Sequence, residues 1–563
     1  ADAIMGRPLG IPKTGVFGLY DLIGIDLMAD VVASLSQILP DGDAFHEVGG
    51  DNKLISSMIS VGLTGDKGKG GFYKNTTEGT KLVLQIEKGA VSGSPNYAQA
   101  TKLTPKPVEL ALKALAAQQE PLKPLLEGKN KYSNFARRVL ARILAYSAGL
   151  IPSVTETPQD IDDAMKLGFN WQRGPFEIMD AVGSEMMHEL LALVDLPVPE
   201  VLKNKNLFYK VDGSALTVRH ADGNYKPFSV PAGVIRFGMK RRTMMPILEN
   251  DSASLFVLNG FAEGVNDLRL IEFHTKANAL TDGSMEIVAA AANDHGSGII
   301  VHNDAQHFSA GVDLNAFRDY IEQQDWDGID GFLKRFQNAV YKLKYTPVPV
   351  VGAPSGLAAG GGFEVLAHCD KLVAHSNSVM GLVESGVGVV PSGGGVKETF
   401  LRWFNTTNSW EDAAWKTWMN LGYGATGSSP ELASKLQYFR EGHDEVVMNR
   451  DRLLSRAISI IGEMQDSYIA PRKPFIQLAN KNLSEKMDEF MQAGVDRGDF
   501  MPHDKTVALT IGAIMLNDTD HDGHCDETAF FERERRAFIS LAKTKETYAR
   551  ISSMLDNGSP IRN

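Results

Sequence analysis

The front of the chain contains an internal repeat, which limits the fold more than any other feature. The stretches GVFGLYDLIGID (15–26) and GPFEIMDAVGSE (174–185) share the frame Gly-x-Phe-x-x-x-Asp-x-x-Gly. Each copy ends in an aromatic pair followed by lysine, in GGFYKN (70–75) and LFYKV (207–211). Because each copy repeats the same pattern, the chain is predicted to begin with a duplicated structural unit.

The second copy has a lead-in of two predicted helices. Thr157-Pro158 predicts a helix that starts with proline and carries acids in its first turn. The chain opens at ADAIMG, which aligns with the end of DIDDAMKLG (160–168), so the first copy lacks this lead-in. We therefore expect the sequence to be a fragment of a longer protein. Apolar residues at helical spacing predict the earlier helix: Phe135, Val139, Ile143 and Tyr146.

The remaining segments differ in the secondary structure that their residue patterns predict. Between the copies lies an insertion with a strand-like KLVLQIE, and HADGNYKPFSVP (220–231) is rich in turn residues and predicts a linker. From residue 253, strand-like SLFVLNG, DLRLIEFH and SGIIVHND alternate with a helix capped by Thr281 or Asp282. This alternation is typical of an α/β domain.

Composition excludes several classes of protein. Apolar residues make up 43% of the chain and charged residues 22%, as in ordinary globular proteins. A net charge of −12 argues against nonspecific nucleic-acid binding. We find no apolar run long enough to span a bilayer and no leader segment. Two cysteines in 563 residues predict a reducing, cytoplasmic location.

Three segments combine glycine-rich loops with acidic residues. HFSAGVDL (307–314) is a loop of small residues that enters a helix. GLAAGGGFEVLAHCD (356–370) places three glycines before an apolar helix that carries Glu364. MGLVESGVGVVPSGGG (380–395) carries Glu384 and ends in a glycine-rich turn. A buried glutamate is costly unless it is paired or has a function.

These segments suit one kind of chemistry. Glycines at a helix start expose N–H groups toward negative charge, with the helix dipole behind them. A second N–H from the SAGV loop would complete a pair that holds a carbonyl as it becomes an enolate, each donor contributing about 3–4 kcal/mol in the transition state. Two glutamates fit the addition of water to an activated double bond. Alternatively, the glycines only permit close packing and the glutamates lie on the surface.

The combination of FSAGVDL, GGGFE, Glu384 and PSGGG resembles the crotonase (enoyl-CoA hydratase) family over about residues 250–405. The resemblance implies an oxyanion hole formed by the N–H groups of Val312 and Gly361. It also implies Glu364 and Glu384 as the acid/base pair. Having both glutamates favours hydration over double-bond isomerisation.

Two further positions follow from the same resemblance. The Ala310 loop is expected to lie near the coenzyme A part of the substrate. Ser392 stands where the family usually has glycine, and its backbone N–H is expected to help place the water.

The front half resembles the C-terminal helical domains of the L-3-hydroxyacyl-CoA dehydrogenases, in their duplicated form. The C-terminal ERERRAFISLAKTKETYARISSML is similar to the tail of bifunctional β-oxidation enzymes. Such a dehydrogenase needs a Rossmann domain with a G-x-G-x-x-G turn for NAD, and we find no such turn after a strand. We therefore expect no cofactor in this chain, NAD only in the missing domain, and no hydride transfer.

The resulting fold prediction is multidomain, with mostly helical dehydrogenase-type domains before an α/β crotonase (ββα spiral) domain and a helical tail. The predicted boundaries are 1–74 (first repeat), 75–130 (insertion), 131–219 (second repeat), 220–252 (linker), 253–470 (crotonase domain) and 471–563 (helical extension).

The predicted function is hydration of trans-2-enoyl-CoA to 3-hydroxyacyl-CoA. The alternatives are an enoyl-CoA isomerase and a non-catalytic docking subunit of a β-oxidation complex. We expect an acyl-CoA substrate, a thiolase partner and a homo-oligomer, with no nucleic acid, membrane span or metal. Acyl-chain length stays open, as does metal binding by the acidic turn NDTDHDGHCDET (517–528).

Overall fold

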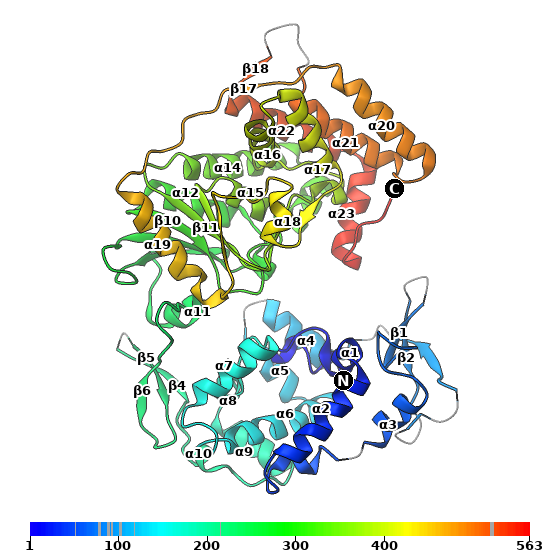
Figure 1. Cartoon of the computed structure of the whole chain (residues 1–563), viewed down its shortest axis with the longest axis vertical. Coiled ribbons are helices and arrows are strands. Elements are labelled where there is room, and N and C mark those ends of the chain that lie inside the picture. The colour runs from blue at the N-terminus through cyan, green and yellow to red at the C-terminus, as the bar shows by residue number, and fades with distance from the viewer. Residues whose placement is uncertain are drawn as a thin grey trace. The chain divides into compact units, whose positions relative to one another are not determined.

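The computed structural model consists of two compact units, Ala1–Ser229 (unit 1) and Val230–Asn563 (unit 2), shown in Figure 1. None of the described helices combines the length and apolar character that crossing a membrane requires. The structure describes residues 1–50, 52–76, 80–86, 90–91, 94–100, 104–116, 119–213, 215–517 and 523–563.

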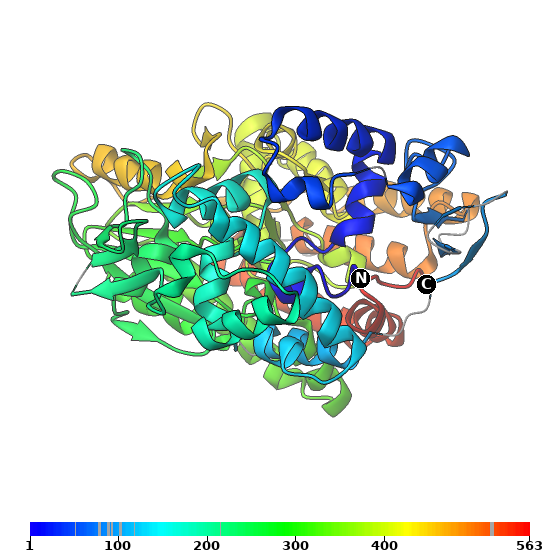
Figure 2. The ribbon, with the colours of Figure 1, turned by 90° about the horizontal axis from the view of Figure 1, so that it is seen from below.

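Unit 1 is mainly helical, with two small antiparallel sheets of order β1-β2-β3 and β4-β5-β6. Its chain runs from dark blue to green in Figures 1 and 2. The helices are α1 Gly15–Ile23, α2 Ile25–Ile38, α3 Lys53–Ser60, α4 Lys106–Ala116, α5 Leu122–Leu126, α6 Lys131–Gly149, α7 Pro158–Phe169, α8 Pro175–Val182, α9 Ser184–Leu193 and α10 Glu200–Lys203, with 3-10 turns η1 Arg7–Leu9 and η2 Ala44–Glu47. The strands are β1 Tyr73–Asn75, β2 Lys81–Leu84, β3 Tyr97–Gln99, β4 Tyr209–Asp212, β5 Ala215–Arg219 and β6 Tyr225–Pro227.

Carboxylates hold the first copy of the repeat together. Asp21 of α1 accepts hydrogen bonds from the backbone N–H groups of Phe72 and Tyr73, each at 2.8 Å. Asp2 accepts one from the N–H of Phe17 at 2.9 Å and one from the Tyr73 hydroxyl at 2.8 Å. The repeated aspartate and the aromatic pair are therefore two ends of one hydrogen-bonded arrangement.

The second copy repeats this arrangement bond for bond. Asp180 of α8 accepts from the N–H groups of Phe208 and Tyr209 at 2.7 and 2.8 Å. Asp162 of α7 accepts from the N–H of Phe176 and from the Tyr209 hydroxyl, both at 2.8 Å. The aromatic pair in each copy leads directly into the first strand of a small sheet. The predicted duplication is thus present in the structure.

Helix α6 confirms the predicted lead-in helix but turns a different face inward. Phe135 and Tyr146 are 39% and 38% exposed, whereas Leu140 and Leu144 are fully buried. The buried stripe also contains alanines, which let α6 approach its neighbours closely. Periodicity correctly predicts the helix here, but the larger side chains do not mark its core face.

The segment expected to be a linker begins inside unit 1. His220 donates its backbone N–H to Asn224 at 2.9 Å and closes the hairpin between β5 and β6. The turn residues of 220–224 therefore join two strands, and the boundary between the units falls after Ser229. In the insertion, the predicted strand is present as β2, although residue 87 of that stretch lies outside the described residues.

Unit 2 is an α/β structure followed by a run of helices (Figure 1). Its helices are α11 Phe237–Lys240, α12 Asp282–Asn293, α13 Leu314–Gln323, α14 Trp326–Lys344, α15 Gly361–Ala367, α16 Gly395–Thr407, α17 Trp410–Gly422, α18 Pro430–Ser434, α19 Leu453–Gln465, α20 Leu483–Arg497, α21 Pro502–Met515, α22 Glu527–Ala542 and α23 Lys545–Asn557, with 3-10 turns η3 Arg241–Thr243, η4 Lys276–Asn278, η5 Glu384–Val387 and η6 Arg450–Arg452. Its strands are β7 Leu248–Glu249, β8 Ala253–Leu258, β9 Leu268–Phe273, β10 Gly298–His302, β11 Val350–Ala353, β12 Leu357–Ala359, β13 Lys371–His375, β14 Val379–Gly381, β15 Thr426–Gly427, β16 Glu445–Val447, β17 Ile476–Gln477 and β18 His524–Cys525.

A seven-stranded sheet of order β16-β13-β11-β10-β9-β8-β7 forms the centre of unit 2. Strands β9, β10, β11, β13 and β16 run parallel, while β7 and β8 pair antiparallel. Alternate side chains enter two different cores. Ile299 joins the core formed with α12 and α14, and Ile300 joins the core covered by α19. Strands buried on both faces explain the continuous apolar runs in the sequence.

A second, smaller sheet carries the glycine-rich loops. Its order is β12-β14-β15, and β12 leads straight into α15. Strand β14 leads into η5, where Glu384 is the first residue. Because β12 and β14 are parallel neighbours, their carboxyl ends bring Glu364 and Glu384 to the same side of the sheet.

Candidate active site

Two backbone N–H groups lie side by side where β12 ends. Residue Gly361 is the first of α15, so its N–H has no partner within the helix. Leu280 pairs with the SAGV loop through two hydrogen bonds. Its N–H donates to the Gly311 oxygen, and its oxygen accepts from the N–H of Asp313, so the N–H of Val312 takes no part in this pairing. Within the described residues neither the Val312 nor the Gly361 N–H has an acceptor. A Cβ on Gly361 would lie 2.9 Å from Val312 Cγ1, so the two residues are in contact.

The three consecutive glycines are each required by a close neighbour. A Cβ on Gly362 would lie 2.5 Å from the Ser309 Cβ, and one on Gly361 would press on Val312. The backbone of Gly360 has φ +55°, a left-handed conformation that favours glycine. A Cβ there would lie 3.1 Å from Oε1 of Glu384. The glycines therefore let a carboxylate and a second loop approach the start of α15.

Glu364 sits in the first turn of α15 and is 3% exposed. Its Oε1 accepts hydrogen bonds from the N–H groups of Gly393 at 2.7 Å and Gly395 at 2.8 Å. Burial raises the pKa of Glu364 to about 7, while these two bonds act in the opposite direction. A glutamate with this pKa changes its protonation state near neutral pH.

Glu384 lies beside Gly360, and its Oε2 is buried without a partner in the described part of the chain. Burial raises its pKa well above the ordinary value, and repulsion from Glu364 and Glu534 adds to the shift. Because the charge of Glu364 raises the pKa of Glu384, the protonation of one glutamate depends on that of the other. An unpaired carboxylate oxygen next to two free N–H groups is able to exchange a proton with a bound molecule.

The Ser392 side chain, which the sequence adds where the family usually has glycine, is buried and hydrogen-bonded to the backbone. Its hydroxyl donates to the backbone oxygens of Glu534 at 3.1 Å and Val390 at 3.3 Å. The Ser392 N–H has no acceptor among the described residues. The role of this N–H in placing water stays a prediction.

Ala310 is exposed, and its N–H donates to Ala277 at 3.1 Å. Ala277 and Asn278 both have left-handed backbones, with φ of 55° and 51°. This contact joins the two loops at the edge of the site. The contact of Ala310 with coenzyme A stays a prediction.

Glu534 is the important residue that the sequence reasoning missed. It lies in α22, is fully buried, and accepts from the N–H groups of Gly394 and Lys397, each at 2.9 Å. Glu364 and Glu534 together therefore occupy the N–H groups at the start of α16. The sequence did contain a signal, because Glu534 shares its helix face with Phe530 and Phe538 at spacings of four.

His368 contacts both the helix that carries Glu364 and the glycine turn before α16. Its Nδ1 lies 2.7 Å from the backbone oxygen of Glu364, which can only accept, so Nδ1 carries the hydrogen. Burial lowers the pKa of His368 to about 3, and the ring is therefore neutral at physiological pH. A Cβ on Gly394 would lie 2.6 Å from the His368 Cε1, which explains glycine at that position.

The acidic turn at 517–528 lies partly outside the described residues, including Asp518, Asp520, His521 and Asp522. Elsewhere in the chain, the described residues contain no group of three or more His, Cys, Asp or Glu side chains arranged to hold a metal. Cys369 is buried and Cys525 is half-buried, and neither forms a disulfide.

Comparison with known families agrees with both halves of the fold. Residues 263–403 match the enoyl-CoA hydratase/isomerase family, and residues 1–75 and 135–213 match the 3-hydroxyacyl-CoA dehydrogenase C-terminal domain. The chain thus combines two 3-hydroxyacyl-CoA dehydrogenase C-terminal domains with a crotonase domain. The predicted resemblance and fold class are confirmed.

Several relatives match almost the whole chain. A probable 3-hydroxyacyl-CoA dehydrogenase of Bacillus subtilis is 28% identical over all of this chain and 70% of its own length. A putative fatty acid oxidation complex trifunctional enzyme of Rickettsia prowazekii is 26% identical over 98% of this chain and 69% of its own length. Among solved structures, an enoyl-CoA hydratase from Bacillus halodurans is 17% identical, with 53% of this chain and 99% of that chain covered and a TM-score of 0.36.

Proposed function

We propose that unit 2 adds water to trans-2-enoyl-CoA thioesters to give 3-hydroxyacyl-CoA. The observation that carries the proposal is the pair of free N–H groups on Val312 and Gly361 beside the unpaired oxygen of Glu384. Two such donors match a thioester oxygen that gains negative charge. The match to the hydratase/isomerase family supports the same chemistry.

The reaction uses one proton on the glutamate pair. The thioester oxygen accepts hydrogen bonds from Val312 and Gly361. Glu364, ionised, takes a proton from water as the water oxygen bonds to C3, and the double-bond electrons move to the thioester oxygen as an enolate. Glu384, protonated, then gives its proton to C2. The pair ends with one proton, as it began, and one water has been added.

The environments of the two glutamates favour these roles. The Glu364 carboxylate accepts two N–H hydrogen bonds, which stabilise its charge, whereas Glu384 Oε2 has no donor among the described residues. Glu364 therefore ionises first, and Glu384 keeps the shared proton. Environments that push two pKa values apart commonly assign the base and the acid in this way.

The direct test is hydration of crotonyl-CoA, followed by loss of the enoyl absorbance, with wild type, Glu364→Gln and Glu384→Gln. Either substitution is expected to lower kcat by about 10² to 10⁴, the range for general acid or base catalysis. Activity that survives Glu364→Gln but not Glu384→Gln would indicate double-bond isomerisation instead. No turnover by the folded wild type would favour the docking-subunit alternative.

We also propose a place in fatty-acid β-oxidation, which the similarity to the putative fatty acid oxidation complex trifunctional enzyme of Rickettsia prowazekii supports. In that setting the 3-hydroxyacyl product is the substrate of a dehydrogenase. We expect this chain to form no NADH in the hydration assay when NAD is added. The thiolase partner and the homo-oligomer stay predictions, and size-exclusion chromatography with light scattering would test the second.

A further inference from the structure

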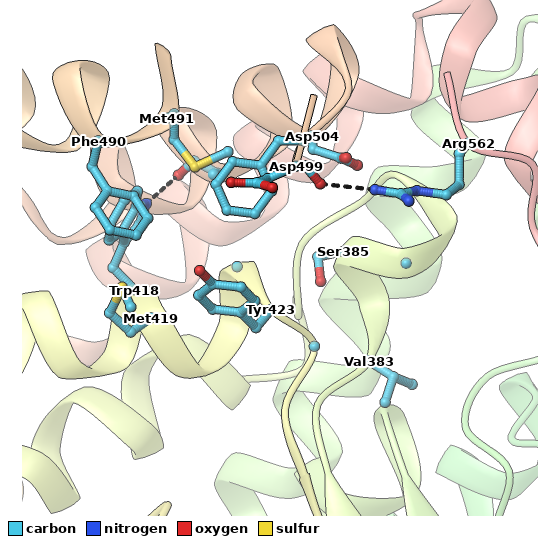
Figure 3. Close-up of a pocket in the computed structure, with 15 residues that line it drawn as sticks. Val383, Ser385, Trp418, Met419, Tyr423, Phe490, Met491, Asp499, Asp504 and Arg562 are labelled. Carbon is cyan, nitrogen blue, oxygen red and sulfur yellow. Dashed lines mark hydrogen bonds between the residues drawn. The ribbon is translucent and has the colours of Figure 1, made fainter. Parts of the chain in front are cut away.

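The turn that carries Glu384 borders a cavity of about 430 Å³, which Val383, Ser385 and Gly386 help to line (Figure 3). Turn η5 has only four residues, and the hydrogen bonds of a 3-10 turn have poorer geometry than those of an α-helix. Oε2 of Glu384 has no partner among the described residues, so no hydrogen bond to that atom fixes the carboxylate. The place of the carboxylate therefore depends on what holds the backbone of η5.

Helix α23 contacts the residue that ends η5 through a buried threonine. Thr547 is fully buried, and its hydroxyl donates to the Gly388 oxygen at 2.7 Å. His503 Nε2 lies 2.9 Å from the same hydroxyl oxygen. Because the only hydroxyl hydrogen points to Gly388, Nε2 of His503 is the donor of this second bond. Gly388 has φ +85°, and a Cβ there would lie 2.8 Å from Thr547 Oγ1, so glycine lets α23 approach the turn.

Arg550, three residues further along α23, contacts the beginning of η5. It is buried, and its guanidinium donates to the backbone oxygen of Ser385, the residue after Glu384, at 3.3 Å. The same guanidinium donates to Oδ1 of Asn563 at 2.7 Å and to Oδ1 of Asp504 at 2.6 Å. A planar group with partners on several sides keeps one orientation. Both ends of η5 are therefore tied to α23.

We infer that α23 positions Glu384 for proton transfer, with Thr547 and Arg550 as positioning residues that act through the backbone of η5. The inference rests on the proposed hydration, in which Glu384 gives a proton to C2. A general acid has to lie within hydrogen-bond reach of the atom that receives its proton. A misplacement of about 1 Å, caused by a substitution far from the reacting atoms, costs about 10²-fold in rate.

The pKa of Glu384 distinguishes positioning from a merely structural role. Burial raises this pKa, repulsion from Glu364 and Glu534 adds to the shift, and the buried Tyr438 is a further titratable group that interacts with Glu384. In the proposed hydration Glu384 must be protonated, so kcat/KM falls as the pH rises through its pKa. A turn that moves Glu384 out of these surroundings lets the pKa fall toward its ordinary value, and this alkaline limb moves to lower pH. Loss of folded protein lowers the profile equally at every pH and leaves the limb in place.

The experiment measures kcat, KM and the pH profile of crotonyl-CoA hydration in wild type, Thr547→Val, Thr547→Ser and Thr346→Val. Thr547→Val removes the hydroxyl and keeps nearly the same shape. Its kcat should fall about 10- to 100-fold with KM changed less than about threefold, and its alkaline limb should move to lower pH. Thr547→Ser keeps the hydroxyl and should restore most of kcat and the wild-type limb.

Thr346→Val is the matched control. Thr346 is also buried, and its hydroxyl donates to the backbone oxygens of Leu343 at 3.1 Å and Val348 at 3.0 Å, which are not part of η5. The same substitution there removes a comparable buried hydroxyl. The thermal midpoint should therefore fall about as far as in Thr547→Val, while kcat and the alkaline limb stay as in wild type.

Several results would overturn the inference. One is a Thr547→Val variant whose kcat and alkaline limb match those of Thr346→Val. Another is a lower kcat in Thr547→Val without a shift of the limb, which would make Thr547 merely structural.

Arg550→Lys gives a second reading if Thr547→Val does not fold. Lysine keeps a positive charge beside Asp504 but cannot form all the hydrogen bonds of the guanidinium. We expect its alkaline limb to move to lower pH as well, and an unmoved limb would overturn the inference. A folded wild type that does not hydrate crotonyl-CoA contradicts the proposed hydration itself, so the two failures are distinguishable.

Discussion

Carboxylates in both units accept hydrogen bonds from backbone N–H groups, yet the two units use them differently. In unit 1 each oxygen of Asp21 has its own donor, and the partners are fixed parts of the fold. In unit 2 Glu364 gathers two donors on one oxygen, and Glu384 leaves a buried oxygen without a partner in the described part of the chain.

The difference separates carboxylates that stabilise the fold from the carboxylate that we propose to react with substrate. A carboxylate with all its oxygens occupied stabilises the fold and has no acceptor left for a substrate. A buried oxygen without a donor destabilises the folded state, and it persists where function requires it. Hydrogen-bond saturation, rather than burial alone, therefore distinguishes Glu384 from Asp21 and Glu534.

The largest expected effect comes from the unsaturated carboxylate. Glu384→Gln removes the proposed acid and should lower kcat for hydration about 10² to 10⁴-fold. The thermal midpoint should change little, because Glu384 Oε2 has no hydrogen bond to lose in the described part of the chain. Crotonyl-CoA assays and thermal unfolding of the same preparation check both parts. A loss of stability equal to that of a saturated carboxylate would contradict the distinction.

The next effect comes from a saturated carboxylate in unit 1. Asp21→Asn keeps one acceptor but places an NH₂ group against the N–H of Phe72 or Tyr73. An unpaired buried donor costs about 1–3 kcal/mol. Hydrogen exchange at these two amides should become faster while kcat for hydration stays unchanged. Unchanged exchange would show that Asp21 does not stabilise the repeat.

Glu534 tests the same rule inside unit 2. Glu534→Gln should cost about 1–3 kcal/mol of stability, because the N–H of Gly394 or Lys397 loses its acceptor. Hydration should fall less than tenfold, since neither oxygen of Glu534 is free for substrate. Denaturant unfolding and crotonyl-CoA kinetics provide the two readouts. A loss of kcat as large as in Glu384→Gln would mean that saturation does not separate the two roles.

The smallest effect is a pH dependence from Asp162. Burial, together with repulsion from Glu177, raises the pKa of Asp162 to about 7. The unfolded aspartate loses its proton near pH 4, so between these values the folded state binds more protons. The free energy of unfolding should therefore decrease as pH rises, by less than about 1.4 kcal/mol between pH 6 and 7. Asp162→Asn should lack this slope, and an equal slope in the variant would assign it to another group.

Sequence patterns predicted where the candidate site lies, because glycines occur where another segment packs closely against the backbone. The structure brings Val312, Gly361, Glu364 and Glu384 together from three segments, as the loop order suggested. The catalytic roles of these residues stay predictions. The pattern could not predict which side chains from distant segments, such as Glu534, pack between these loops. Such contacts join residues that are far apart in the sequence.

Two local errors have physical causes. In α6 the large side chains of Phe135 and Tyr146 suggested the core face, but the buried face uses smaller residues such as Ala136. In α22 the run of charges around Glu534 indicates a solvated helix, yet this one carboxylate is buried because it caps α16. Hydropathy alone does not reveal a charged group that packing makes structural.

The contact between Glu534 and the start of α16 joins residues 140 and 137 positions apart in the chain. During synthesis the two loops that carry Glu364 and Glu384 leave the ribosome long before α22. Their glycine turn cannot be locked until residue 534 is available, and contacts this distant in sequence form slowly. The order of translation therefore delays completion of the candidate site, so that a nascent chain forms the sheet before the site is complete.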